Sequence, residues 1–305
     1  MKSRSGTDVM NTRHLAAMRR LATLTLFGAC AAGVQAKVVE EQFDLPVQVT
    51  DAYGKRIEQS IKVTVFSDDA IPGPKPVIVI NHGRAGEASE RASMGRSRYP
   101  EASRWFAREG FIVALPTRIG YGATGGEDVE DSGSCARKNF APGYLAAAAQ
   151  AVAVLDAVRA RPDAMKDHSV ILGQSYGGAT SVAIASLNPP GVVASINFAG
   201  GGGDPKGRPQ NPCSPQQIKR MYVQFAETAR MPMLWAYTEN DQYWGPALPR
   251  DWVEAFRAAG GTAEFVQFTP HGEDGHSLFA RFPDVWKPTV ADFLRRQGFE
   301  MKDLP

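Results

Sequence analysis

The stretch that decides the fold is SVILGQSYGGAT, residues 169–180, where an apolar run meets a serine flanked by glycines. Gly173, Ser175 and Gly177 match the pattern Gly-X-Ser-X-Gly, and a run of small residues typical of a helix follows. A strand that turns sharply into a helix forces the side chain at the turn outward, and glycines two residues to either side relieve the crowding. We therefore expect Ser175 to project its hydroxyl from this turn, at a helix N-terminus.

Outside this turn, short apolar runs alternate with helical stretches. Uninterrupted apolar runs indicate strands that are buried on both faces, and their alternation with helices predicts an α/β fold with a mostly parallel sheet and helices on both faces. Two earlier β-rich segments on either side of Asp51-Ala52-Tyr53-Gly54 predict an antiparallel hairpin at the sheet edge. The expected later strands are residues 77–80, 111–116, 169–173, 192–198, 233–237 and 263–268.

The N-terminal segment, residues 1–36, has the order of a signal peptide. Basic residues precede an uncharged apolar run, Leu21 to Val34, and a small-residue cleavage pattern ends at Ala36. The run is shorter than the roughly 20 residues of a membrane span, so we expect none. The sequence therefore predicts an exported protein, periplasmic or secreted, whose mature part is one domain, residues 37–305. An uncleaved tail and a lipid anchor on Cys30 are the alternatives.

Charge and cysteine content describe the expected surroundings of the mature chain. The net charge is +2 for the whole chain and −2 without residues 1–36, which hold five basic residues and one acidic residue. Because no basic excess remains, nucleic acid is not an expected partner. The two remaining cysteines, Cys135 and Cys213, predict a disulfide in an oxidising compartment, with two free thiols as the alternative. They lie in insertions 117–142 and 200–215, which we expect to border the ligand crevice.

A nucleophilic serine needs an imidazole base that is oriented by a carboxylate. We prefer His276 to His271 as the base, because a glycine precedes it and a helical segment follows. Asp241 is the preferred acid, since it follows the penultimate expected strand; Asp204 and Glu239 are the alternatives. All these candidates follow the serine in the chain.

Two backbone N–H groups are expected to form an oxyanion hole. One belongs to Tyr176, directly after the serine, and the other to Arg84, in the loop that follows the strand at residues 77–80. We expect His82 to brace this loop rather than to take part in chemistry. Trp244 and Tyr176 are the candidates for the substrate pocket. The sequence contains no metal-binding motif, so we expect no metal and no cofactor.

Taken together, the motifs VIVINHG, GQSYGG, TEND and GEDGHSLF resemble the α/β-hydrolase superfamily and, within it, the dienelactone-hydrolase-like branch. The resemblance covers residues 76–297 and implies a sheet of about eight strands, a nucleophile at Ser175, an acid at Asp241, a base at His276 and no metal. Dienelactone hydrolases proper use a cysteine as the nucleophile. The serine in this chain therefore favours a simple, small-molecule carboxylic ester as the substrate.

Two other functions fit the same motifs. The pattern Gly-X-Ser-Tyr-Gly-Gly is also found in the hydrolase domains of prolyl-oligopeptidase-type peptidases, so peptide hydrolysis is the second candidate. The third is a binding module that keeps the fold without turnover. A binding module has no reason to keep an acid and a base at the correct loop ends, and this distinguishes it from an enzyme.

Overall fold

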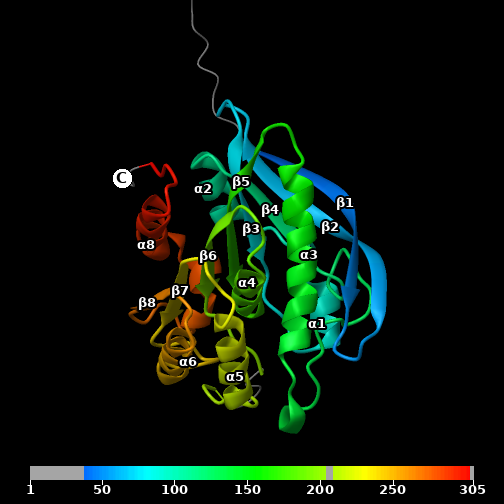
Figure 1. Ribbon diagram of the computed structural model, residues 1–305, viewed down its shortest axis with the longest axis vertical. Coiled ribbons are helices and arrows are strands. Elements are labelled where there is room, and N and C mark those ends of the chain that lie inside the picture. The colour runs from blue at the N-terminus through cyan, green and yellow to red at the C-terminus, as the bar shows by residue number, and fades with distance from the viewer. Residues whose placement is uncertain (1–37, 204–208, 303–305) are drawn as a thin grey trace, which may run out of the picture. The chain divides into compact units, whose positions relative to one another are not determined.

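The computed structural model of the protein describes residues 38–203 and 209–302. The predictions for residues 1–36, Cys30 and Asp204 fall outside this part. The described residues form an eight-stranded sheet in the order β1-β2-β4-β3-β5-β6-β7-β8 (Figure 1). The strands are β1 (Val38–Thr50), β2 (Arg56–Asp68), β3 (Lys75–Asn81), β4 (Ile112–Thr117), β5 (Ala164–Gln174), β6 (Val192–Phe198), β7 (Met233–Thr238) and β8 (Ala263–Phe268).

Strand directions confirm the predicted α/β sheet. β1 and β2 form the expected antiparallel hairpin, and its turn contains Gly54 with a φ of 82°, a value that glycine adopts without strain. β2 also pairs antiparallel with β4, whereas β4, β3, β5, β6, β7 and β8 run parallel to one another. The carboxyl ends of the six parallel strands therefore meet at one edge, where ligands bind in open α/β sheets.

Helices cover both faces because alternate strand residues point to opposite sides. Val77 and Val79 of β3 belong to one buried cluster with α3, α4, α5 and α6, while Ile78 and Ile80 belong to a second cluster with α2, α7 and α8. The helices are α1 (Ala88–Ser93), α2 (Pro100–Arg108), α3 (Ala141–Arg159), α4 (Tyr176–Leu187), α5 (Pro215–Ala226), α6 (Ala247–Ala258), α7 (Leu278–Arg281) and α8 (Pro283–Arg296).

The helix α3 has the length and composition of a membrane span, with a mean hydropathy of 1.4 over 18 residues. More than half of that window, 56%, is buried inside the domain, where α3 packs on α4 and on the sheet. A core helix that is covered from several sides is also apolar around much of its circumference. The apolar surface of α3 is thus used in the core.

Candidate active site

The predicted turn at Ser175 joins β5 to α4. Ser175 has φ 58° and ψ −123°, a backbone conformation that is rare for a residue with a side chain. The flanking glycines are required by close backbone contacts. A Cβ atom on Gly173 would lie 2.0 Å from the carbonyl oxygen of Gly177, and one on Gly177 would lie 2.1 Å from that of Asn81. The backbone therefore pushes the Ser175 side chain out at the carboxyl edge of the sheet.

The three residues preferred from the sequence lie together at this edge. His276 Nε2 is 2.9 Å from Ser175 Oγ, and His276 Nδ1 is 3.0 Å from Asp241 Oδ2. The Asp241 side chain is fully buried, and His276 is nearly so. In such a hydrogen-bonded chain, a carboxylate fixes the orientation of an imidazole, which can then accept the proton of the serine hydroxyl.

Backbone donors hold the Asp241 carboxylate in place. Its second oxygen, Oδ1, accepts hydrogen bonds from the N–H groups of Tyr243 (2.8 Å) and Trp244 (3.0 Å), which lie in the same turn after β7. These two hydrogen bonds fix the position of Oδ1. The turn leaves Oδ2 for the imidazole.

Three further residues orient His276. The backbone N–H of His276 donates to Asp274 Oδ1 (2.9 Å), and its carbonyl accepts from Gln174 Nε2 (2.9 Å). The ring of Tyr243 stacks on the imidazole with 3.9 Å between the centroids and 21° between the planes. Sequence reasoning did not identify these residues. Only Asp274 carries a local signal, since it is the N-cap of the short turn that holds the histidine.

The alternative acid and base candidates lie elsewhere. His271 is partly buried, and its Nδ1 bonds to the carbonyl oxygen of Thr269 (2.7 Å) at the end of β8. Glu239 is exposed, and its backbone N–H pairs with the carbonyl of Phe268. Neither residue joins the chain of hydrogen bonds that ends at Ser175.

The loop after β3 runs beside the serine. A Cβ atom on Gly83 would lie 3.3 Å from Ser175 Cβ and 3.8 Å from Ser175 Oγ, so the loop backbone lies directly against the serine side chain. Within the described part of the chain, the backbone N–H groups of Arg84 and Tyr176 donate no hydrogen bond. The roles of these two N–H groups in an oxyanion hole stay a prediction.

His82 braces this loop, as expected. Its Nδ1 lies 2.7 Å from the carbonyl oxygen of Gly83, and its Nε2 accepts from the backbone N–H of Arg118 at 3.2 Å. Burial, together with the charge of Arg118, lowers the pKa of His82 well below its usual value of 6.5. His82 is therefore neutral, with the proton on Nδ1, which donates to Gly83.

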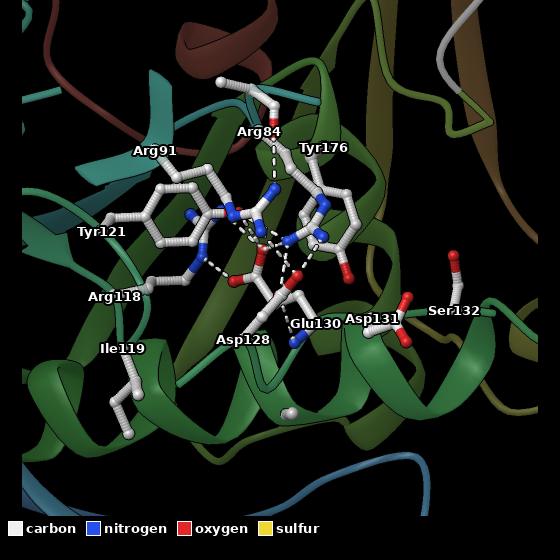
Figure 2. Close-up of polar contacts among 12 residues, drawn as sticks. Arg84, Arg91, Arg118, Ile119, Tyr121, Asp128, Glu130, Asp131, Ser132 and Tyr176 are labelled. Atoms are coloured by element: carbon white, nitrogen blue, oxygen red, sulfur yellow. Dashed lines mark hydrogen bonds and ion pairs between the residues drawn. The ribbon is translucent and has the colours of Figure 1, made fainter. Parts of the chain in front are cut away.

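A cluster of paired charges lies behind the loop. Figure 2 shows the guanidinium groups of Arg84, Arg91 and Arg118 converging on the carboxylates of Asp128 and Glu130. Arg84 binds Asp128 through two hydrogen bonds (2.7 and 2.6 Å), and Arg91 lies 3.0 Å from the same carboxylate. Arg118 and Glu130 form a fully buried pair at 2.5 Å. These residues appear in the sequence as scattered loop charges, so the cluster was not predicted.

A pocket of about 750 Å³ opens beside Ser175. This volume is typical of small-molecule sites. Both predicted pocket residues line it. The Trp244 indole is fixed by a hydrogen bond to the Ala199 carbonyl (2.7 Å), and the Tyr176 ring stacks on Tyr144 with 4.1 Å between centroids. The pocket thus has rigid aromatic walls near the serine. Charged residues of the cluster described above, Arg84, Arg91 and Asp128, also line it.

The two insertions meet at this pocket and are joined by the predicted disulfide. Cys135 and Cys213 are bonded, with 5.2 Å between their Cα atoms, and Ser214 Oγ donates to the Cys135 carbonyl (2.6 Å). The first insertion contributes Asp128, Asp131, Ser132, Lys138 and Phe140 to the pocket lining, and the second contributes Gly201, Gly202, Gly203 and Pro209. Across residues 38–203 and 209–302, no cluster of three or more metal-ligating side chains is present.

The sheet order, the strand-to-helix turn at Ser175 and the loops that carry His276 and Asp241 define an α/β-hydrolase fold. The sequence model of the dienelactone hydrolase family matches residues 61–292. This chain belongs to that family and is a hydrolase.

Solved structures share this fold at low sequence identity. The acetyl xylan esterase from Paenibacillus sp. R4 is 18% identical, with a TM-score of 0.56, and the match covers 86% of this chain and 88% of the esterase. An esterase from Pyrococcus furiosus is 14% identical, with a TM-score of 0.52 and coverages of 83% and 90%. The acylaminoacyl peptidase of Pyrococcus horikoshii is 14% identical, with a TM-score of 0.58; the match covers 88% of this chain but 43% of the peptidase.

Proposed function

We propose that this protein is an exported serine hydrolase that cleaves a small-molecule carboxylic ester. The observation that carries the proposal is the hydrogen-bonded chain from Ser175 through His276 to Asp241 at the edge of the pocket. Ser175 is the nucleophile, His276 the general base and acid, and Asp241 the residue that fixes the imidazole tautomer.

In the first half of the reaction, Ser175 Oγ attacks the ester carbonyl while His276 Nε2 accepts the hydroxyl proton. The carbonyl oxygen becomes an oxyanion, which accepts hydrogen bonds from the backbone N–H groups of Tyr176 and Arg84. The N-terminus of α4 adds its partial positive charge at the same place. The intermediate then expels the alcohol, which takes the proton from His276, and the acyl group remains on Ser175.

In the second half, a water molecule gives a proton to His276 Nε2 and attacks the acyl carbonyl. A second tetrahedral intermediate forms in the same oxyanion hole, and its collapse returns the proton to Ser175 and releases the carboxylic acid. Tyr243, stacked on the imidazole, limits ring rotation between the two halves.

Export is supported by two independent observations. The residue order of segment 1–36 is that of a signal peptide, and the Cys135–Cys213 disulfide is typical of proteins in oxidising compartments. A disulfide between two surface insertions would be reduced in most cytosols. We therefore propose a periplasmic or secreted location.

A panel of p-nitrophenyl esters with acyl chains of increasing length tests the proposal. The wild-type protein is expected to turn over at least one ester, and Ser175→Ala is expected to lower kcat by about 10⁴-fold or more. Ser186→Ala is the matched control, because Ser186 lies near the other end of the same helix and its hydroxyl donates to the Ala183 carbonyl, away from Ser175. A fluorophosphonate probe should label the wild type and the control but not Ser175→Ala.

Peptide p-nitroanilides, assayed beside the esters, and the fluorophosphonate probe test the two other functions. Hydrolysis of peptide p-nitroanilides at rates similar to the esters would favour the peptidase. Absence of turnover and of fluorophosphonate labelling in a folded wild-type protein would refute the enzyme and favour a binding module.

A further inference from the structure

Arg118 and Glu130 form a buried pair directly behind the loop that carries the Arg84 N–H. Both side chains are fully buried, and Arg118 Nε donates to Glu130 Oε1. The hydroxyl of Tyr121 donates to Glu130 Oε2 at 2.5 Å. Burial, followed by the charge of Glu130, raises the pKa of Tyr121, so this hydroxyl keeps its proton. The Glu130 carboxylate is therefore satisfied, and the guanidinium has donors left for other groups (Figure 2).

Those donors point at the loop backbone. Arg118 Nη1 donates to the carbonyl oxygen of His82 at 2.8 Å, and Nη2 is shared, since it lies 3.4 Å from the carbonyl oxygen of Gly83 and 3.4 Å from Glu130 Oε2. One planar guanidinium thus contacts two successive carbonyl groups and a carboxylate. A lysine at this position could not do so, because its ammonium is a single point with no fork.

The Gly83 carbonyl decides where the Arg84 N–H points. Both groups belong to one peptide unit, which is planar and trans, so its C=O and N–H point in opposite directions. The carbonyl is held on one side of the loop by Arg118 and by His82 Nδ1. The N–H must then point to the other side, where the loop backbone approaches Ser175.

Stability alone is a weak reason for such a pair. Removing two charges from water costs several kcal/mol per ion, and apolar residues of similar volume often stabilise a fold as well or better. The pair instead places the N–H donors of Arg118 beside the loop carbonyl groups. Hydrogen bonds to charged donors are the strong ones, and here they fix a backbone segment that has no regular secondary structure.

We propose that Arg118, with its charge balanced by Glu130, is a positioning residue that orients the Gly83–Arg84 peptide as an oxyanion donor. The inference rests on the proposed ester hydrolysis. It assigns to Arg118 no contact with the substrate, and it predicts an effect on the transition state rather than on substrate binding.

Two variants of the full chain test the inference. Arg118→Lys keeps the positive charge beside Glu130 but lacks the planar guanidinium with its several N–H donors. The double variant Arg118→Met with Glu130→Gln removes both charges together. The matched control is Arg159→Met, which removes another buried arginine, one that donates to the carbonyl of Pro190 (2.6 Å) away from the serine. Fluorophosphonate titration counts the competent sites, so that kcat is expressed per site.

We expect both Arg118 variants to lower kcat per site by about 10- to 100-fold, because one fully lost oxyanion donor costs about 10²- to 10³-fold. KM should stay within about threefold of wild type. The inhibition constant of a boronic acid, whose adduct with the serine carries an oxygen in the oxyanion hole, should rise by the same factor as kcat falls. Arg159→Met should keep the wild-type kcat and the wild-type inhibition constant.

Three results would overturn the inference. The first is a wild-type kcat in either Arg118 variant. The second is an equal loss in the Arg159→Met control. The third is failure of both Arg118 variants to fold, which would make the pair a stabilising element of the fold. A wild-type protein without Ser175-dependent turnover would instead refute the proposed function, so the two failures are distinguishable.

Discussion

Removal of the Cys135–Cys213 disulfide tests both the stability of the domain and the shape of its pocket. The double variant Cys135→Ala with Cys213→Ala leaves two insertions that are joined only by weaker contacts, such as the hydrogen bond from Ser214 to the Cys135 carbonyl. The perturbation therefore acts on the unfolded chain, which gains freedom, and on the native pocket wall.

The separation of 78 residues sets the magnitude. In the chain-entropy model, a crosslink that closes a loop of this size lowers the entropy of the unfolded chain by about 15 cal/mol/K, which is about 4.5 kcal/mol at 25 °C. We expect the free energy of unfolding to fall by about this amount and Tm to fall by roughly 8–10 °C for a domain of this size. Guanidinium unfolding under non-reducing conditions measures the change.

Activity gives a second, independent readout. Both insertions line the pocket, whereas Ser175, His276 and Asp241 lie on other loops, outside the two insertions. We therefore expect KM for a p-nitrophenyl ester to rise about tenfold, with little change in kcat. The rise corresponds to about 1.4 kcal/mol of binding free energy that is spent on ordering the pocket wall.

The wild-type protein in reductant is the control, and it should behave as the double variant does. A loss of unfolding free energy below about 1 kcal/mol, at an unchanged denaturant slope, would refute the entropic reasoning. A fall in kcat at constant KM would refute the assignment of the disulfide to the pocket wall.

The remaining predictions concern the acid, the turn and the buried histidine. Asp241→Asn should lower kcat by about 10⁴-fold because the imidazole loses its correct tautomer, while Glu239→Gln, at an exposed side chain, should leave kcat unchanged. Gly177→Ala places a Cβ atom 2.1 Å from the Asn81 carbonyl, so a thermal melt should show a loss of about 3 kcal/mol or more and the ester assay a loss of most activity. The pKa of His82 is lower in the folded than in the unfolded chain, so the unfolded chain binds more protons below pH 6.5 and stability falls as the pH falls. Denaturant titrations between pH 7 and 5 should show the free energy of unfolding of the wild type falling by up to about 1.4 kcal/mol per pH unit, and no such fall in His82→Gln. The same pH dependence in both proteins would contradict the prediction.

Much of the fold follows from the sequence because most of its parallel strands contain a short apolar run. The runs at 77–80 and 192–198 fall on β3 and β6, which are buried along most of their length, so little polar alternation interrupts the pattern. The run at 263–268 coincides with β8, although this edge strand is mostly half-buried. The positions of Ser175, His276 and Asp241 also follow, because each lies just after a strand that ends at the same edge.

The parts that were not predicted depend on approach in space. β5 begins at Ala164, five residues before the expected strand. The sequence did not indicate this extension because Lys166 and Asp167 are polar and exposed, unlike the residues of a buried strand. Arg118 and Glu130 are charged residues at the start of and within an insertion, where charges are normally solvated, and only the folded chain brings them together. Tyr243 could equally have been a core aromatic.

The base and the nucleophile lie 101 residues apart in the chain, on loops after the fifth and the last strand. A partly folded chain in which β7 and β8 have not docked has an exposed hydroxyl but no imidazole beside it. Recovery of turnover during refolding should therefore lag behind recovery of secondary structure. The enzyme assay then measures the rate at which β7 and β8 dock onto the sheet.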